Sequence, residues 1–148
     1  MTAYLVDPSD FTPEALAKIA PTCGEGCEPG KVSLVGGAVI YPHRSDLADK
    51  WLWRCACGAY CGTHPNLSSV GTPAGPETRR AREAAHAAFD PLWRRRMELS
   101  GIDQKTARGR GYRWLATELG IKRKDCHIGM MSQATAMQVV EICRRHHP

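Results

Sequence analysis

The segments CGEGC at residues 23–27 and CAC at residues 55–57 decide the fold of this 148-residue chain. Each segment offers two thiols from one backbone turn, and the 27 residues between them can bring the two pairs together around one ion. Four thiolates close a tetrahedral coordination sphere and leave no position for a reactive water, so the ion would be structural. The predicted ligands of one Zn²⁺ are Cys23, Cys27, Cys55 and Cys57.

Two further side chains leave the fourth ligand open. Cys57 and Cys61 repeat the three-residue gap of the first pair, and His64 follows closely, so Cys61 and His64 are alternative ligands. Unliganded buried cysteines are the competing interpretation. Five cysteines within 39 residues argue against it.

Composition narrows the class of protein. Hydrophobic residues make up 43% and charged residues 24% of the chain, as in ordinary globular domains. We find neither a stretch as long as a membrane span nor a signal peptide, so we expect no membrane partner. Seven cysteines in such a chain favour a reducing compartment, which predicts the cytoplasm, or the host cytoplasm for a phage-encoded protein.

Charge is concentrated in the middle of the chain. Residues 77–124 hold thirteen Lys or Arg against six Asp or Glu, whereas residues 1–76 carry a net charge of −2. Such a cluster is typical of a surface that faces phosphates. A solvated helical face is the alternative interpretation.

The first half of the chain predicts a small antiparallel sheet. Thr12 and Pro13 begin a short helix over 13–19. Alternating apolar residues predict a hairpin of 31–35 with 38–41, followed by a strand over 51–55 and another at Tyr60. This is the skeleton of a zinc ribbon.

The second half predicts about three helices. One opens at Pro76 and runs to about Met97, with a kink or break where Pro91 interrupts it. A second covers 104–119 between Asp103 and Gly120, and a third covers 133–144. The fold class is therefore α+β. We expect a zinc-ribbon-like subdomain over 1–70 and a basic helical subdomain over 76–148 packed on it.

Several motifs resemble a known family. They are CGAYCGTHPN at 57–66, RAREAAHAAFDPLW at 80–93, GYRWLATELGI at 111–121, CHIGMM at 126–131 and YPHRSDL at 41–47. In this order they resemble the zinc-finger-containing domain family of unknown function, which is common in phages and prophages. The resemblance implies a zinc module and no established activity. The sequence departs from the family pattern between Cys57 and His64, where the second pair is usually CxxC and valine stands at the position of Cys61.

The basic side chains are the main functional clue. Arginine outnumbers lysine ten to three within 77–124, and its planar guanidinium suits phosphate. Trp93, Tyr112 and Trp114 lie among these residues and could stack on bases if exposed, although Trp93 and Trp114 are expected to be buried. The predicted nucleic-acid contacts are Arg79, Arg80, Arg82, Arg94, Arg95, Arg108, Arg110, Arg113, Lys122, Arg123 and Lys124.

We therefore expect a zinc-binding protein that binds nucleic acid largely without sequence preference, in phage DNA metabolism. One alternative is an adaptor or inhibitor that contacts a host protein. Another is a metal-dependent nuclease whose second metal site would need His64, His86, Asp90 and His127 to converge. We find no metalloprotease, P-loop or dinucleotide motif that favours an enzyme.

Overall fold

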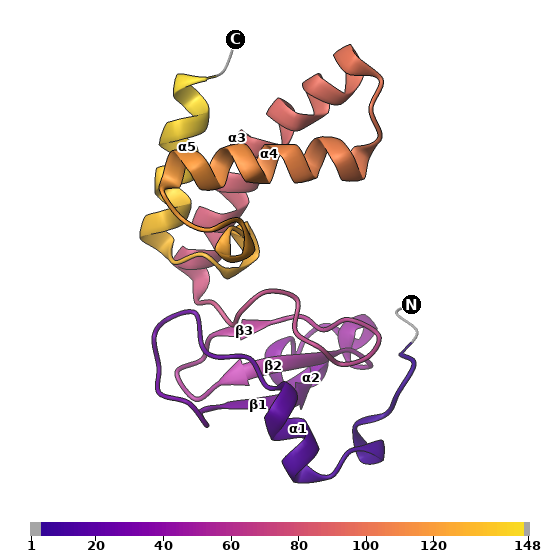
Figure 1. The fold of residues 1–148 in the computed structure, drawn as a ribbon. Coiled ribbons are helices and arrows are strands. Elements are labelled where there is room, and N and C mark those ends of the chain that lie inside the picture. Colours follow the sequence, from indigo (N-terminus) through magenta and orange to yellow (C-terminus); the bar gives the residue numbers. More distant parts are fainter. Residues whose placement is uncertain (1–3, 147–148) are drawn as a thin grey trace. The chain divides into compact units, whose positions relative to one another are not determined.

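The computed structural model describes residues 4–146 and divides the chain into two compact units, residues 1–75 and 76–148. The first, here the sheet unit, holds the strands, and the second, the helical unit, holds the three long helices (Figure 1). The predicted α+β class is confirmed.

The sheet unit is built on three antiparallel strands in the order β1-β2-β3. They are β1 (Val32–Gly36), β2 (Trp51–Cys55) and β3 (Tyr60–Cys61). Val32 pairs with Cys55 and Gly36 with Trp51, so β1 and β2 form a hairpin along their full lengths. Trp53 at the centre of β2 is buried, and its indole N–H donates to the Leu67 carbonyl at 2.9 Å. This bond holds the loop after β3 against the sheet.

The prediction that residues 38–41 form a strand paired with 31–35 is wrong. Gly37–Ile40 forms a single helical turn, α2, and the partner of β1 is β2. The Gly37 amide donates to the Lys50 carbonyl at 2.7 Å, and a Cβ on Gly37 would stand only 1.8 Å from the Leu47 carbonyl oxygen. The chain therefore turns back tightly here, and Val39 is left exposed on the turn instead of paired in a sheet.

Short helices complete the sheet unit. The helix α1 (Pro13–Ile19) begins as predicted, because the Thr12 hydroxyl accepts from the Ala15 amide at 3.2 Å. Single 3₁₀ turns occupy Pro8–Asp10 and Ser45–Leu47 here, and Arg123–Asp125 and Ile128–Met130 in the helical unit.

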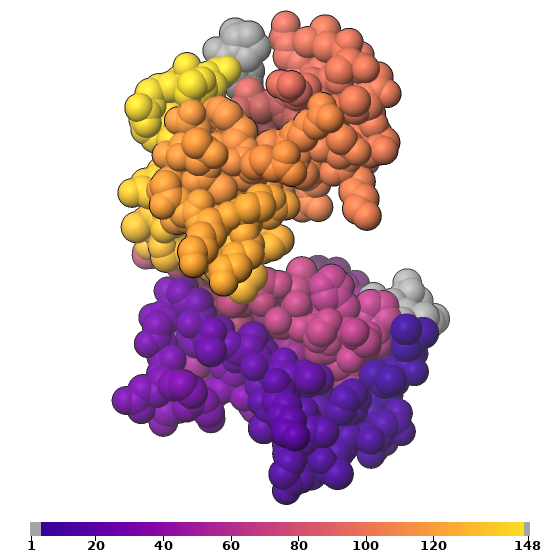
Figure 2. Space-filling model, in the orientation of Figure 1, coloured from indigo at the N-terminus to yellow at the C-terminus, as the bar shows by residue number. Residues whose placement is uncertain are grey.

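The helical unit consists of α3 (Pro76–Ser100), α4 (Gln104–Leu119) and α5 (Gln133–Arg145). Helix α4 crosses α3 and α5 (Figure 1), and its side chains cover one face of the unit (Figure 2). Asp103 and Gly120 bound α4 as predicted: the Asp103 carboxylate accepts from the Thr106 amide at 2.7 Å, and Gly120 adopts a left-handed φ of 71°. Ser132 caps α5 in the same way.

Pro91 does not break α3, which runs through it to Ser100. Phe89 and Trp93 on either side of Pro91 are both buried, whereas Pro91 itself is exposed. Packing of these two rings outweighs the cost of a proline inside a helix, about 3 kcal/mol from the lost backbone hydrogen bond together with the clash of the ring. The predicted alternative of a break is therefore wrong.

One apolar core holds the helical unit together. Phe89, Leu115, Ile128 and Val139 are fully buried in it. On α5, Ala136 and Val139 are buried in this core, whereas Met137 is exposed. None of the helices within residues 4–146 is long and apolar enough to cross a membrane.

Candidate metal centre

Four cysteines of the sheet unit come together. Cys23 and Cys27 lie after α1, Cys55 ends β2, and Cys57 lies in the turn before β3. Their sulfur atoms all lie within 4.8 Å of one another, and the Sγ atoms of Cys23 and Cys57 are 3.8 Å apart. Two tight turns thus bring two pairs of thiols to one point.

A left-handed glycine shapes each turn. Gly26 has a φ of 86° and donates its amide to the Cys23 carbonyl at 3.2 Å. Gly58 has a φ of 99° and donates to the Cys55 carbonyl at 2.9 Å. A side chain would strain both positions, so glycine lets each turn close tightly enough to direct two sulfurs to the same side.

Backbone hydrogen bonds fix the first turn to the loop that follows β3. The Gly24 amide donates to the Pro73 carbonyl at 2.8 Å, and the Glu25 carboxylate accepts from the Gly75 amide at 3.0 Å. That loop is joined to the sheet, because the amides of Tyr60 and Ala74 donate to each other's carbonyls at 3.2 and 3.1 Å. Both cysteine pairs are therefore anchored to β2 and β3.

Without a metal ion, the cluster favours the protonated form of Cys23 and Cys27. Hydrogen bonding to Cys57, and then to Cys55 and Cys23, raises the pKa of Cys27 to about 12. Burial raises the pKa of Cys23. Burial acts in the same direction on Cys55, but hydrogen bonds from the Cys57 amide and the neighbouring thiols outweigh it and lower the pKa of Cys55. The four sulfurs cannot all ionise beside one another without a cation, and a divalent ion would remove that penalty.

Cys61 and His64, the alternative ligands, lie outside the cluster. Cys61 pairs with Trp53 across β2 and β3 and is buried in the sheet unit. His64 is exposed, and its amide donates to the Ser68 carbonyl at 2.8 Å. The CAC spacing works because the Cys55 amide donates to the Ala59 carbonyl at 2.8 Å, which closes a turn with Cys57 near its tip.

These residues define a zinc-stabilised sheet module. Four thiolates are the donor set of closed structural zinc sites, and they suit one structural zinc ion. The ion would hold the two turns together and would leave no coordination position for substrate.

Comparison with known families agrees with this geometry. The model of a zinc-finger-containing domain of unknown function matches residues 17–146, and the chain belongs to that family. The match spans both units, so the helical unit is part of the family's domain. No curated protein and no solved structure matches the chain significantly.

The residues predicted to contact nucleic acid all lie in the helical unit, and most are exposed. Arg79 is half-buried. Those on the surface are Arg80, Arg94, Arg95, Arg108, Arg110, Arg113, Lys122, Arg123 and Lys124. Arg108 and Arg123 lie against the buried Tyr112 ring, at 5.5 and 5.1 Å from its centroid.

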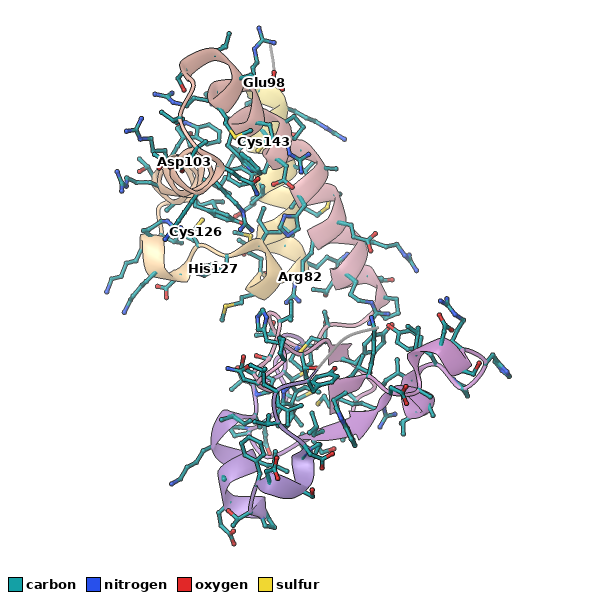
Figure 3. The ribbon with its side chains drawn as sticks, turned by 90° about the vertical axis from the view of Figure 1, so that its right-hand side faces the viewer. Arg82, Glu98, Asp103, Cys126, His127 and Cys143 are labelled. Atoms are coloured by element: carbon teal, nitrogen blue, oxygen red, sulfur yellow. The ribbon has the colours of Figure 1, made fainter. Side chains whose placement is uncertain are left out.

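Arg82 has a structural role instead. It is 8% exposed (Figure 3), and its Nε donates to the Met131 carbonyl at 2.8 Å, which ties α3 to the residue just before the N-cap of α5. In the sequence, Arg82 shares helical spacing with Thr78, Ala85 and Phe89, and the structure buries all four on one face of α3. We therefore omit Arg82 from the proposed contact surface.

The residues of the nuclease alternative are divided between the units. His64 belongs to the sheet unit and the other three to the helical unit. His86 Nδ1 lies 3.9 Å from Asp90 Oδ1, while the His127 ring lies 6.0 Å from that of Tyr112. Within residues 4–146, metal-binding side chains gather in groups of three or more at the four cysteines, and not around His86, Asp90 and His127.

Proposed function

We propose that this protein is a zinc-stabilised module whose helical unit binds nucleic acid, largely independently of sequence. The zinc site would hold the sheet unit in shape, since a closed tetrathiolate centre offers no open position for chemistry. Binding would then come from the exposed basic side chains of the helical unit. Because the family that the sequence resembles is common in phages and prophages, we assign the protein to phage DNA metabolism in the cytoplasm.

The observation that carries the proposal is the surface of α4. Lys105, Arg110 and Arg113 line one shallow hollow, whose other walls are Thr106 and Gly109. All three cationic side chains are exposed, and they follow one another along α4 at intervals of five and three residues. Such a row of donors over a depression suits the successive phosphates of a nucleic-acid backbone.

The net charge of the helical unit as a whole also favours nucleic acid as the partner. Residues 77–124 carry a net +7 with ten arginines, and residues 125–148 are neutral. Phosphate contacts bind any sequence alike, so affinity should fall steeply as salt rises.

A paired charge reversal tests the proposal. Lys105→Glu with Arg113→Glu should weaken binding of a labelled mixed-sequence duplex, measured by fluorescence anisotropy at rising salt. The slope of log K against log salt should become shallower by about 2, or about one for each lost phosphate contact.

Lys18→Glu with Lys31→Glu is the matched control, because it changes the net charge equally but lies on exposed positions of the sheet unit. This control should keep the wild-type slope. Equal losses in the two double variants would refute the α4 surface. A wild-type protein that ignores nucleic acid but captures a defined host protein would favour the adaptor alternative.

A further inference from the structure

A groove opens in the helical unit between the C-terminal half of α3 and α4, with the end of α5 beside it (Figure 2). It encloses about 270 Å³ and is open along one side. This is slightly less than the roughly 300–1,000 Å³ of sites that take drug-sized ligands. A single planar ring fits such a space better than an extended molecule.

The floor of the groove is aromatic and rigid. Phe89 and Trp93 form it, and both rings are buried. The Trp93 indole N–H donates to Asp90 Oδ1 at 3.0 Å, which fixes the orientation of that ring. Gly111 brings α4 onto the floor, because a Cβ there would lie 3.1 Å from Phe89 Cζ and 3.2 Å from Trp93 Cβ. This glycine therefore has a packing role within a helix that it otherwise weakens.

Trp114 forms a wall of the groove. Its side chain is half-buried, and the His146 ring meets it edge-on at a centroid distance of 5.2 Å. A partly open indole held by an edge contact can accept a second ring by stacking. Every nucleobase has a π-face, so this contact would be tolerant of sequence.

The rim of the groove is cationic. Arg96 and Arg110 line it, both are exposed, and no Asp or Glu is among the described residues that form its wall. Arg110 also lines the hollow that holds Lys105 and Arg113. The aromatic groove and the proposed phosphate surface are therefore adjacent, because Arg110 lines both.

We propose that this groove receives one unpaired base of a nucleic-acid strand, with Arg96 and Arg110 contacting the flanking phosphates. The inference rests on the proposed nucleic-acid function and adds to it a preference for single-stranded segments or strand ends. Charge complementarity selects this occupant, since an apolar peptide would not need two arginines at the rim and a second copy of the basic helical unit would be repelled.

The test compares three probes: an oligothymidylate, the same strand with abasic residues in place of its bases, and a duplex. Trp114→Leu removes the stacking surface, while Trp114→Phe keeps an aromatic ring. We expect Trp114→Leu to weaken oligothymidylate binding about tenfold, as base–aromatic stacking does elsewhere, and to leave duplex affinity unchanged. Trp114→Phe should keep most of the affinity for oligothymidylate. Binding should quench the protein's tryptophan fluorescence less in this variant than in the wild type, because the stacked indole is missing. The abasic strand should bind the wild type and Trp114→Leu equally.

The outcomes separate the two proposals. If the wild type binds duplex and oligothymidylate but Trp114→Leu binds both as tightly as the wild type, the groove proposal fails and the basic surface stands. If the abasic strand binds the wild type as tightly as the intact strand, the groove proposal also fails. If no probe binds, both proposals fail. If the groove instead takes a peptide or a second copy, the groove proposal alone fails. Circular dichroism of each variant identifies any loss of binding that comes from unfolding, in which case Trp114→Phe decides.

Discussion

The two units have similar lengths but are held together differently. In the helical unit one continuous core of sixteen buried residues joins α3, α4 and α5. In the sheet unit the buried members of the cluster around the metal site are Cys23, Cys55 and Ala59, two of them predicted ligands, while Leu52, Trp53 and Leu67 are buried elsewhere in the unit. Small domains that cannot bury enough apolar surface commonly depend on a metal. The comparison teaches that one chain can stabilise one unit by apolar packing alone and the other by apolar packing together with a metal site.

Removal of the metal should produce the largest difference in stability between the two units. Cys55→Ser, or a strong chelator, should unfold the sheet unit, because structural zinc binding contributes about 10–16 kcal/mol at neutral pH, which matches or exceeds the usual stability of a domain. The helical unit should remain folded. Hydrogen exchange checks this: amides of β2 should lose protection while those of α3 keep it.

Cys61→Ala is the matched control for that experiment. Cys61 is a buried cysteine of the same unit that lies outside the cluster, so its loss should cost far less stability than loss of the metal and should leave β2 protected. If chelation removed the hydrogen-exchange protection of β2 and α3 together, the stability of both units would depend on the metal, which would contradict the comparison.

A smaller effect distinguishes two neighbouring arginines of α3. Arg82→Met should lower the free energy of unfolding of the helical unit by about 1.5–3 kcal/mol, because it removes a buried charged donor from the Met131 carbonyl. Arg80→Met should leave stability within about 0.5 kcal/mol, since Arg80 is exposed. Urea unfolding followed by circular dichroism measures both. Equal stability of the two variants would contradict a structural role for Arg82.

The last predicted effect is a dependence of the helical unit's stability on alkaline pH. Burial raises the pKa of the Cys143 thiol from 9.0 to about 11 (Figure 3). The folded state therefore holds this proton more tightly than the unfolded state. The resulting stability is fully present below pH 9 and is lost as pH rises toward 11, at no more than about 1.4 kcal/mol per pH unit.

Cys143→Ala provides the comparison for this dependence. Urea midpoints of the helical unit, measured across the same pH range, should fall less steeply in the variant than in the wild type. Identical slopes would show that the thiol does not contribute.

Sequence patterns predicted the elements that local chemistry controls. Thr12 and Asp103 mark helix starts, and Gly120 marks a helix end, because capping is decided by a few adjacent residues. The four clustered cysteines were also predicted, since two tight turns determine most of the cluster's geometry.

Other features depended on tertiary packing and were missed. Residues 38–41 look like a strand, but the close approach of Gly37 to the Leu47 carbonyl turns them into a helical turn. Pro91 should disrupt α3 locally, yet the buried rings of Phe89 and Trp93 keep the helix continuous. The groove could not be predicted either. It depends on how closely α4 approaches α3 at Gly111, and the order of residues along the chain does not give that distance.

Zinc content measured by native mass spectrometry, on the wild type and on two single variants, tests the central claim most directly. The account predicts one zinc per wild-type chain, loss of that zinc in Cys57→Ser, and its retention in Cys61→Ser. A folded wild-type chain without zinc would contradict the account, as would a Cys57→Ser variant that keeps the ion while Cys61→Ser releases it.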